Sequence, residues 1–219
     1  IPWLEPLTVA VGGSINITGV ASASSNLTLK LDGNTVNTVA NAMTISANPT
    51  ITTACTHQVF LEGNNGAVPV KDSFSFYIPP ATTVAPLPSG AVEGINYNAN
   101  NTAVTLVLFA PGKNNVVVVG DFSNWTNQCV YQMNRTPDAN YYWITLTGLT
   151  PGLEYGYQYL IDNSIRIADP YTQKVLDPDN DPFINATTYP NLKPYPTGLT
   201  TSLVGIFQTA EPQYSWQVN

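Results

Sequence analysis

Apolar residues in this chain alternate with small or polar residues in short runs, and no segment shows a helical period. The alternation is clear in Ser14–Val20, Leu27–Leu31, Ser73–Ile78, Ala103–Phe109 and Glu154–Asp162. A period of two places successive side chains on opposite faces of a strand, so that one face can pack into a core. The pattern therefore predicts an all-β chain, and we expect two immunoglobulin-like β-sandwich domains.

A proline-rich stretch separates two groups of such runs. Residues 79–90 contain four prolines in twelve positions. Proline lacks the backbone N–H that a sheet ladder needs, and it favours extended chain. We predict an immunoglobulin-like sandwich at residues 1–79, a proline-rich linker at 80–90 and a second sandwich from residue 91.

The composition excludes several classes of partner. Only 10% of residues are charged and the net charge is -7, so no basic stripe is available for nucleic acid. No run approaches the roughly 18 apolar residues of a membrane span, and we expect no membrane insertion. Cys55 and Cys129 are the only cysteines. Two readings stay open for them, a disulfide or two buried thiols, and the second is favoured because they fall in different predicted domains.

Five short motifs occur in order between Gly94 and Tyr171. They are Phe109-Ala110-Pro111, Val118–Trp125, Tyr142-Trp143-Ile144, Leu149–Tyr157 and Ala168–Tyr171. In this order they resemble carbohydrate-binding module family 48, the N-terminal β-sandwich of isoamylases, pullulanases and glycogen branching enzymes. Tyr141 and Tyr142 depart from the pattern, because a glycine is usual there.

The resemblance implies an organisation for the rest of the chain. Residues 91–185 would form the module, and residues 186–219 an extended segment leading toward a catalytic barrel of the same polypeptide. Gln213–Asn219 is similar to the approach to such a barrel. The first domain resembles the additional immunoglobulin-like domains that precede this module in bacterial α-amylase-like proteins.

The resemblance also implies a carbohydrate site. The candidate residues are Asn124, Trp125, Gln158 and Arg166. An exposed indole is a platform for a sugar ring, but a second reading stays open in which Trp125 packs against the sandwich edge or the neighbouring barrel. Gln158 stands where glycogen binders carry a lysine, and no second tryptophan follows Asn163, which weakens the expected site.

No residues of this chain form a recognisable catalytic, metal or cofactor site. Glycoside hydrolysis needs two carboxylates facing one bond, and the motifs of the α-amylase superfamily are absent. His57 is the only histidine. Asp177, Asp179 and Asp181 have a spacing that hints at Ca²⁺, but the proline-flanked run lacks other features of such a loop, and a solvated acidic turn is favoured.

The leading expectation is therefore a non-catalytic N-terminal region of an α-glucan glycoside hydrolase, secreted or at the surface of a bacterium, periplasmic or associated with the outer membrane. It would brace the catalytic barrel and bind an α-glucan oligosaccharide weakly. Two alternatives stay open: a freestanding cell-surface starch-binding protein, and an adhesive or structural sandwich pair with no sugar ligand.

Overall fold

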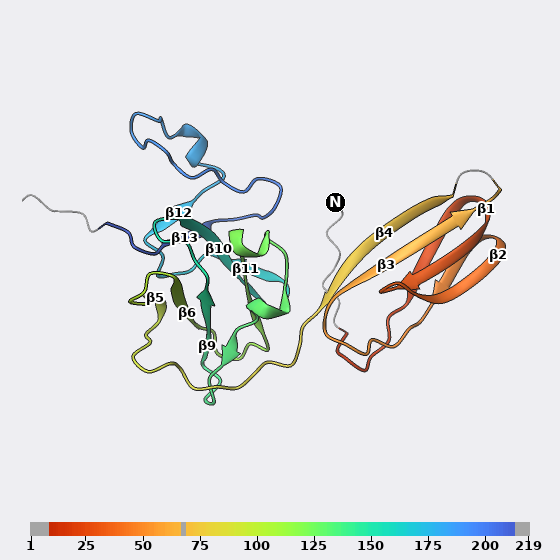
Figure 1. Cartoon of the computed structure of the whole chain (residues 1–219), viewed down its shortest axis with the longest axis horizontal. Coiled ribbons are helices and arrows are strands. Elements are labelled where there is room, and N and C mark those ends of the chain that lie inside the picture. Colours follow the sequence, from red (N-terminus) through yellow and green to blue (C-terminus); the bar gives the residue numbers. More distant parts are fainter. Residues whose placement is uncertain (1–8, 67–68, 213–219) are drawn as a thin grey trace, which may run out of the picture. The chain divides into compact units, whose positions relative to one another are not determined.

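The chain folds into two compact units, Ile1–Pro80 and Ala81–Asn219, in a computed structural model that describes residues 9–66 and 69–212 (Figure 1). We refer to them as unit 1 and unit 2. The helices of the described residues are three short 3₁₀ turns, η1 (Asp121–Ser123), η2 (Cys129–Tyr131) and η3 (Asp181–Phe183). The predicted all-β class is confirmed. The predicted domain ranges stay a prediction.

The residues of unit 1 that the structure describes form one antiparallel sheet with the strand order β2-β1-β3-β4. The strands are β1 (Ile17–Leu31), β2 (Asn34–Ala47), β3 (Cys55–Asn64) and β4 (Val70–Ile78). The two-residue loop Asp32-Gly33 joins β1 to β2, and both residues have positive φ, 50° and 81°. A loop of this kind matches the twist of the flanking strands and permits the tight hairpin.

Alternate residues of the long strands build the core of unit 1. The buried apolar set comprises Ile15, Ile17, Leu27, Leu29, Ile45, Ile51, Val59, Phe76 and Ile78. His57 is also buried, and its ring stacks on Phe76 at a centroid distance of 5.2 Å. Its Nδ1 lies 2.6 Å from Asp32 Oδ2 and its Nε2 lies 3.1 Å from the Thr53 carbonyl oxygen. The only histidine therefore has a structural role, because both ring nitrogens have partners within unit 1.

The described part of unit 2 contains two sheets. The first has the order β5 (Gly94–Tyr97), β6 (Ala103–Phe109), β9 (Tyr141–Thr147) and β8 (Asn134–Arg135). The second has the order β11 (Ile165–Ile167), β10 (Glu154–Ile161), β13 (Val204–Gln208) and β12 (Lys174–Leu176), and β7 (Val116–Gly120) also pairs with β10. All these pairings are antiparallel.

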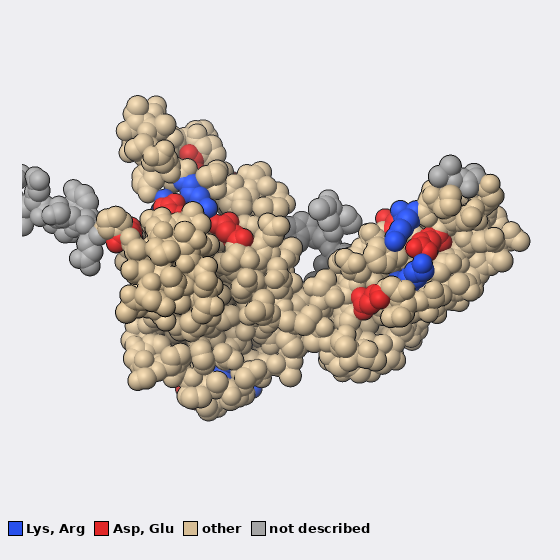
Figure 2. Space-filling model, in the orientation of Figure 1, with Lys and Arg blue, Asp and Glu red and all other residues tan. Residues whose placement is uncertain are grey.

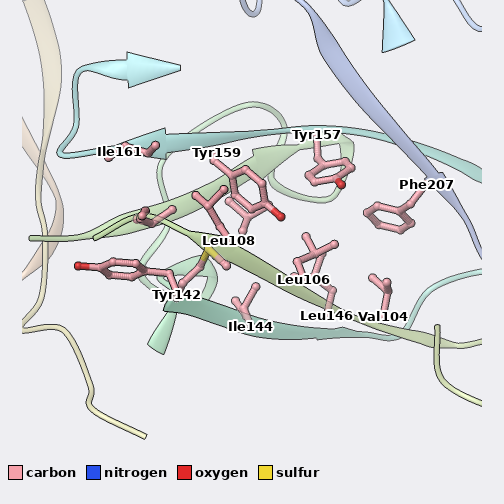
Figure 3. Packing of buried hydrophobic residues seen from close by; sticks show 14 of the residues in the cluster. Val104, Leu106, Leu108, Tyr142, Ile144, Leu146, Tyr157, Tyr159, Ile161 and Phe207 are labelled. Atoms are coloured by element: carbon pink, nitrogen blue, oxygen red, sulfur yellow. The ribbon is translucent and has the colours of Figure 1, made fainter. Parts of the chain in front are cut away.

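The core of unit 2 consists of buried side chains that both sheets contribute (Figure 3). Leu106 and Tyr142 come from the first sheet, and Tyr157, Tyr159 and Phe207 come from the second. These five side chains are at most 1% exposed. Large aromatic rings thus supply much of the buried apolar area that stabilises the sandwich.

A buried carboxylate satisfies the tyrosine hydroxyls of this core. Tyr157 and Tyr159 donate to Asp169 Oδ2 at 2.7 and 2.8 Å, and the Tyr171 backbone N–H donates to Asp169 Oδ1 at 2.8 Å. Asp169 is 2% exposed. Buried polar groups need such partners, so Asp169 ties the loop after β11 to the core.

Part of the proline-rich stretch pairs with unit 2. Val84 forms a parallel bridge with Arg135. The Arg135 N–H donates to the Thr83 carbonyl at 2.8 Å, and the Ala85 N–H donates to the Arg135 carbonyl at 2.9 Å. Trp143 Nε1 donates to the Ala85 carbonyl at 3.1 Å. Residues 83–85 therefore extend the edge of the first sheet beyond β8.

Charged side chains are sparse on the face shown in Figure 2, and several have partners of opposite sign. In unit 1, Lys30 and Lys71 lie 2.7 and 3.5 Å from the carboxylate of Glu62. In unit 2, Lys174 lies 2.6 Å from Glu154. Among the described residues, no helix is long and apolar enough to span a membrane.

The two cysteines correct one expectation. Cys55 and Cys129 are both disulfide-bonded, and neither is a free thiol. Each is only half-buried, whereas an inert structural thiol is usually fully enclosed. The favoured reading of two buried thiols is therefore wrong.

Candidate carbohydrate site

The turn after β7 fixes the residues of the second sequence motif. Gly120 N–H donates to Ser123 Oγ at 3.0 Å, and Trp125 N–H donates to the Gly120 carbonyl at 3.0 Å. Asn124 and Trp125 have φ angles of 53° and 59°. This left-handed region is common for asparagine but rare for a bulky residue. The strain implies that surrounding contacts hold Trp125 in place.

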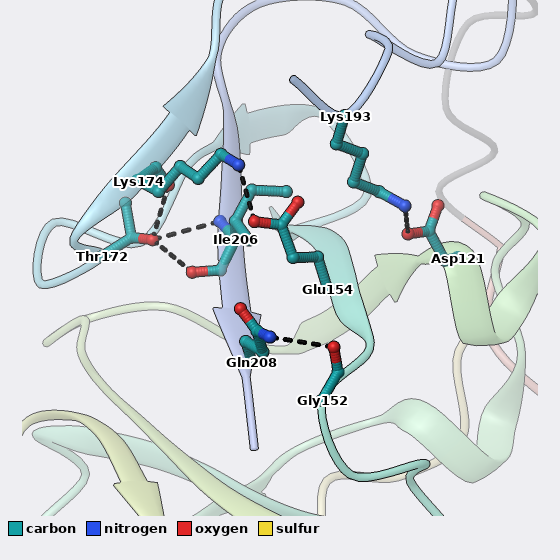
Figure 4. A network of polar contacts seen from close by, with 8 residues as sticks. All are labelled: Asp121, Gly152, Glu154, Thr172, Lys174, Lys193, Ile206 and Gln208. Atoms are coloured by element: carbon teal, nitrogen blue, oxygen red, sulfur yellow. Dashed lines mark hydrogen bonds and ion pairs between the residues drawn. The ribbon is translucent and has the colours of Figure 1, made fainter. Parts of the chain in front are cut away.

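Asp121 makes several of these contacts. Its Oδ1 accepts from Trp125 Nε1 at 3.2 Å, and its Oδ2 accepts from the Gly156 N–H at 2.8 Å. Lys193 Nζ lies 3.1 Å from the same Oδ2 (Figure 4). The indole lies against Gly156, where a Cβ would come within 3.2 Å of Trp125 Cζ2. Trp125 is consequently only 5% exposed, while Asn124 is exposed.

Gln158 is fully buried on β10 and all of its amide is engaged. Its Nε2 donates to the carbonyls of Thr201 and Leu203, both at 2.7 Å. Its Oε1 accepts from the Thr200 hydroxyl. The side chain is 0% exposed, and both of its N–H donors are engaged, so in this arrangement a ligand in solvent cannot contact it.

Arg166 lies on β11 and is half-buried. Its Nη1 lies 3.5 Å from Thr200 Oγ1. Burial lowers the pKa of Arg166 from its ordinary value, although a guanidinium stays charged at physiological pH. Thr200 thus contacts both Arg166 and Gln158.

One segment connects these observations. Residues 193–203, which we call the strap, run between β12 and β13 and contact Asp121, Gln158 and Arg166. The strap is also bonded to itself, since the Tyr195 hydroxyl donates to the Ser202 carbonyl at 2.8 Å. The structure therefore places Trp125, Gln158 and Arg166 in internal contacts and leaves Asn124 at the surface. Carbohydrate binding by these four residues stays a prediction.

The acidic run before the strap forms a self-contained turn. Asp177 Oδ1 accepts from the Asp179 N–H at 2.9 Å, and its Oδ2 accepts from Asn180 Nδ2 at 2.6 Å. The bond from the Asn180 side chain is the main cause that lowers the pKa of Asp177. Within residues 9–66 and 69–212, no three histidine, cysteine or acidic side chains are grouped to hold a metal.

Part of unit 2 is similar in sequence to a known family. Residues 94–172 match the family "carbohydrate-binding module 48 (isoamylase N-terminal domain)". Two 1,4-alpha-glucan branching enzymes of Clostridium perfringens, from strains SM101 and 13, are 32% and 31% identical over 93 residues. Each match covers 36% of this chain and 14% of the relative.

Structural comparison gives more distant likenesses. The crystal structure of the Group B Streptococcus pullulanase SAP is 14% identical and covers 71% of this chain and 21% of the pullulanase, with a TM-score of 0.32. The same pullulanase in complex with maltotetraose is 12% identical, with coverages of 75% and 23% and a TM-score of 0.33. The family resemblance expected from the five motifs is confirmed by the sequence match of residues 94–172 to carbohydrate-binding module 48.

Proposed function

We propose that this chain is the non-catalytic N-terminal region of an α-glucan-active glycoside hydrolase, in which unit 2 braces the catalytic barrel and binds α-glucan weakly. The match of residues 94–172 to carbohydrate-binding module 48 is the observation that carries the proposal. The branching enzymes that share this region support it, because their names specify 1,4-α-glucan. The chain spans 14% of their length.

The geometry around the strap supports the bracing role. The Trp125 indole N–H donates to Asp121, and the Gln158 amide forms hydrogen bonds with the strap. Side chains engaged in this way stabilise local structure, since the buried N–H donors of Trp125 and Gln158 all have acceptors. We infer that the motif residues hold a rigid surface together, and that a neighbouring domain packs on unit 2.

The gene provides the first test. We expect the reading frame beyond Asn219 to encode a barrel with a pair of catalytic carboxylates. In the full-length protein, we expect chemical cross-links between that barrel and Lys113 or Lys193 of unit 2. A reading frame that stops soon after Asn219 would instead favour a freestanding starch-binding protein, and a barrel without cross-links to unit 2 would contradict bracing.

Glucan binding needs a separate test with the chain itself. Maltoheptaose should bind weakly and change tryptophan fluorescence, while cellohexaose, a β-linked glucose oligomer, should not. Trp125→Ala tests whether Trp125 takes part, and Trp143→Ala is the control for the fluorescence that is lost when any one tryptophan is removed. An unchanged affinity in Trp125→Ala removes Trp125 from the site, and no binding by the unaltered chain contradicts the binding role.

We also propose that the protein is secreted or lies at the cell surface. Disulfide-bonded cysteines support this location, because disulfides persist in oxidising compartments. Fractionation of the source cells, followed by thiol labelling of Cys55 and Cys129 without reductant, tests the proposal. Protein found only in the cytoplasm, with both thiols labelled, would contradict it.

A further inference from the structure

A patch of aromatic side chains lies outside the strap contacts of unit 2. Phe109 at the end of β6 is 51% exposed, and Tyr171 after β11 is 55% exposed. Tyr141 opens β9 opposite Phe109, and the two ring centroids are 5.2 Å apart at an interplanar angle of 57°. A contiguous patch of exposed rings is typical of an interaction surface.

The carboxylate of Glu93 accepts a hydrogen bond from each of the two tyrosines, Tyr141 and Tyr171. The Tyr141 hydroxyl donates to Glu93 Oε1 at 3.0 Å, and the Tyr171 hydroxyl donates to Glu93 Oε2. The backbone of Gly94 packs closely against the Cβ of Tyr171, and a Cβ at Gly94 would come within 2.5 Å of that atom. The rings are therefore positioned before any ligand arrives, which reduces the entropy lost on binding.

The charge of the patch restricts its ligand. Among the described residues, no lysine or arginine lies within ion-pair distance of Glu93. The hydrogen bond to Glu93 is the main cause that raises the pKa of both Tyr141 and Tyr171, so their hydroxyls stay neutral at physiological pH. The patch thus combines neutral rings with one acceptor group whose oxygens each keep a further lone pair.

This chemistry suits a neutral pyranose. The C–H face of a sugar ring packs on an aromatic ring, and its hydroxyls donate to a carboxylate. An anionic ligand would be repelled by Glu93. We propose that Phe109, Tyr141, Tyr171 and Glu93 form an α-glucan-binding site of unit 2 that is separate from Trp125 and the strap.

The proposal rests on the proposed glucan-binding function, and the test separates the two. Maltoheptaose is titrated calorimetrically into the unaltered chain and into Phe109→Ala, Tyr171→Ala and Glu93→Gln. Phe183→Ala is the matched control, because it removes a ring that is 86% exposed in a different loop. Thermal unfolding verifies that each variant is folded, and Tyr171→Phe, which keeps the ring, is a milder second variant at that position.

We expect Phe109→Ala and Tyr171→Ala to weaken binding roughly tenfold each, Glu93→Gln to weaken it less, and Phe183→Ala to leave it unchanged. Binding by the unaltered chain with equal affinity in all variants would overturn the site and leave the proposed function intact. No binding by the unaltered chain would overturn both. Tighter binding of tetramethylammonium than of maltoheptaose would also overturn the site, because rings beside a carboxylate can instead hold a cation.

Discussion

Gly120 has the least space of the glycines in unit 2. A Cβ at this position would lie 2.3 Å from the Gly156 carbonyl oxygen and 3.1 Å from Tyr157 Cα. Its φ of 175° is extended backbone that any residue adopts. Space alone therefore requires glycine here, because the neighbouring atoms belong to the backbone of β10 and cannot rotate away.

Gly120→Ala should destabilise unit 2 by about 2–3 kcal/mol, the cost of forcing an extra methyl into a packed interior. Urea unfolding followed by near-UV circular dichroism measures the change. Gly205→Ala is the control, since its Cβ would meet no atom closer than 3.4 Å. Similar small effects of both substitutions would show that β7 and β10 can separate at low cost.

Gln158→Leu should destabilise unit 2 by about 2 kcal/mol. Leucine keeps most of the volume but leaves the Thr200 hydroxyl and the carbonyls of Thr201 and Leu203 without their partner, and buried unsatisfied groups carry that penalty. Gln208→Leu is the matched control, because Gln208 makes one surface hydrogen bond, to the Gly152 carbonyl. Equal losses in urea unfolding would contradict a special role for Gln158.

At the level of elements, the strap depends on Thr200. Thr200→Val keeps the shape of the side chain but removes the hydroxyl that contacts Gln158 and Arg166. We expect backbone amides of residues 197–203 to exchange hydrogen several-fold faster in this variant. Thr197→Val, which removes a weaker contact of 3.5 Å within the strap, should change exchange little, and equal acceleration by both would contradict anchoring through Thr200.

Sequence periodicity predicted two of the long strands of unit 2. The runs at 103–109 and 154–162 correspond to β6 and β10, because each carries a continuous apolar face. Strands β11 and β12 have three residues each, which is too short for a period to show. In unit 1, the runs at 14–20 and 27–31 merge into β1, since shifts in the pairing with β2 carry the strand through the small residues between them.

The motifs located the candidate site but not its environment. Asn124, Trp125 and Gln158 lie in the turn and strand that the sequence indicated. The internal packing of Trp125 was one of the two readings that the sequence left open. The burial of Gln158 was not predicted, because the strap residues that bond its amide lie 42–45 positions later in the chain. Glu93 was missed for a similar reason: its tyrosine partners are 48 and 78 residues away.

Across the whole molecule, buried tyrosines should make stability fall in alkaline solution. Burial raises the pKa of Tyr77 in unit 1 to about 12, and burial raises the pKa of Tyr157 and Tyr159 in unit 2 well above the ordinary value. An unfolded tyrosine ionises near pH 10. The stabilisation is therefore complete below about pH 10 and, for Tyr77, is lost as the pH rises toward 12, because the unfolded chain releases protons first.

Urea unfolding at a series of pH values above about 9 tests this expectation. Tyr77 is the only tyrosine in residues 1–80, so Tyr77→Phe should flatten the alkaline loss in unit 1 and leave that of unit 2 unchanged. Hydrogen exchange resolved by residue distinguishes the two units. A loss in unit 1 that is as steep in Tyr77→Phe as in the unaltered chain would assign it to another group.

The exposed position of Asn124 has a consequence for producing the protein. Asn124-Trp125-Thr126 has the Asn-x-Thr pattern that oligosaccharyltransferase recognises, and Asn124 lies at the surface in a left-handed turn. A eukaryotic secretory host would attach a bulky glycan there, beside the indole of Trp125. Such material would present its own sugar next to the motif under study, so bacterial expression is the appropriate source for glucan-binding measurements.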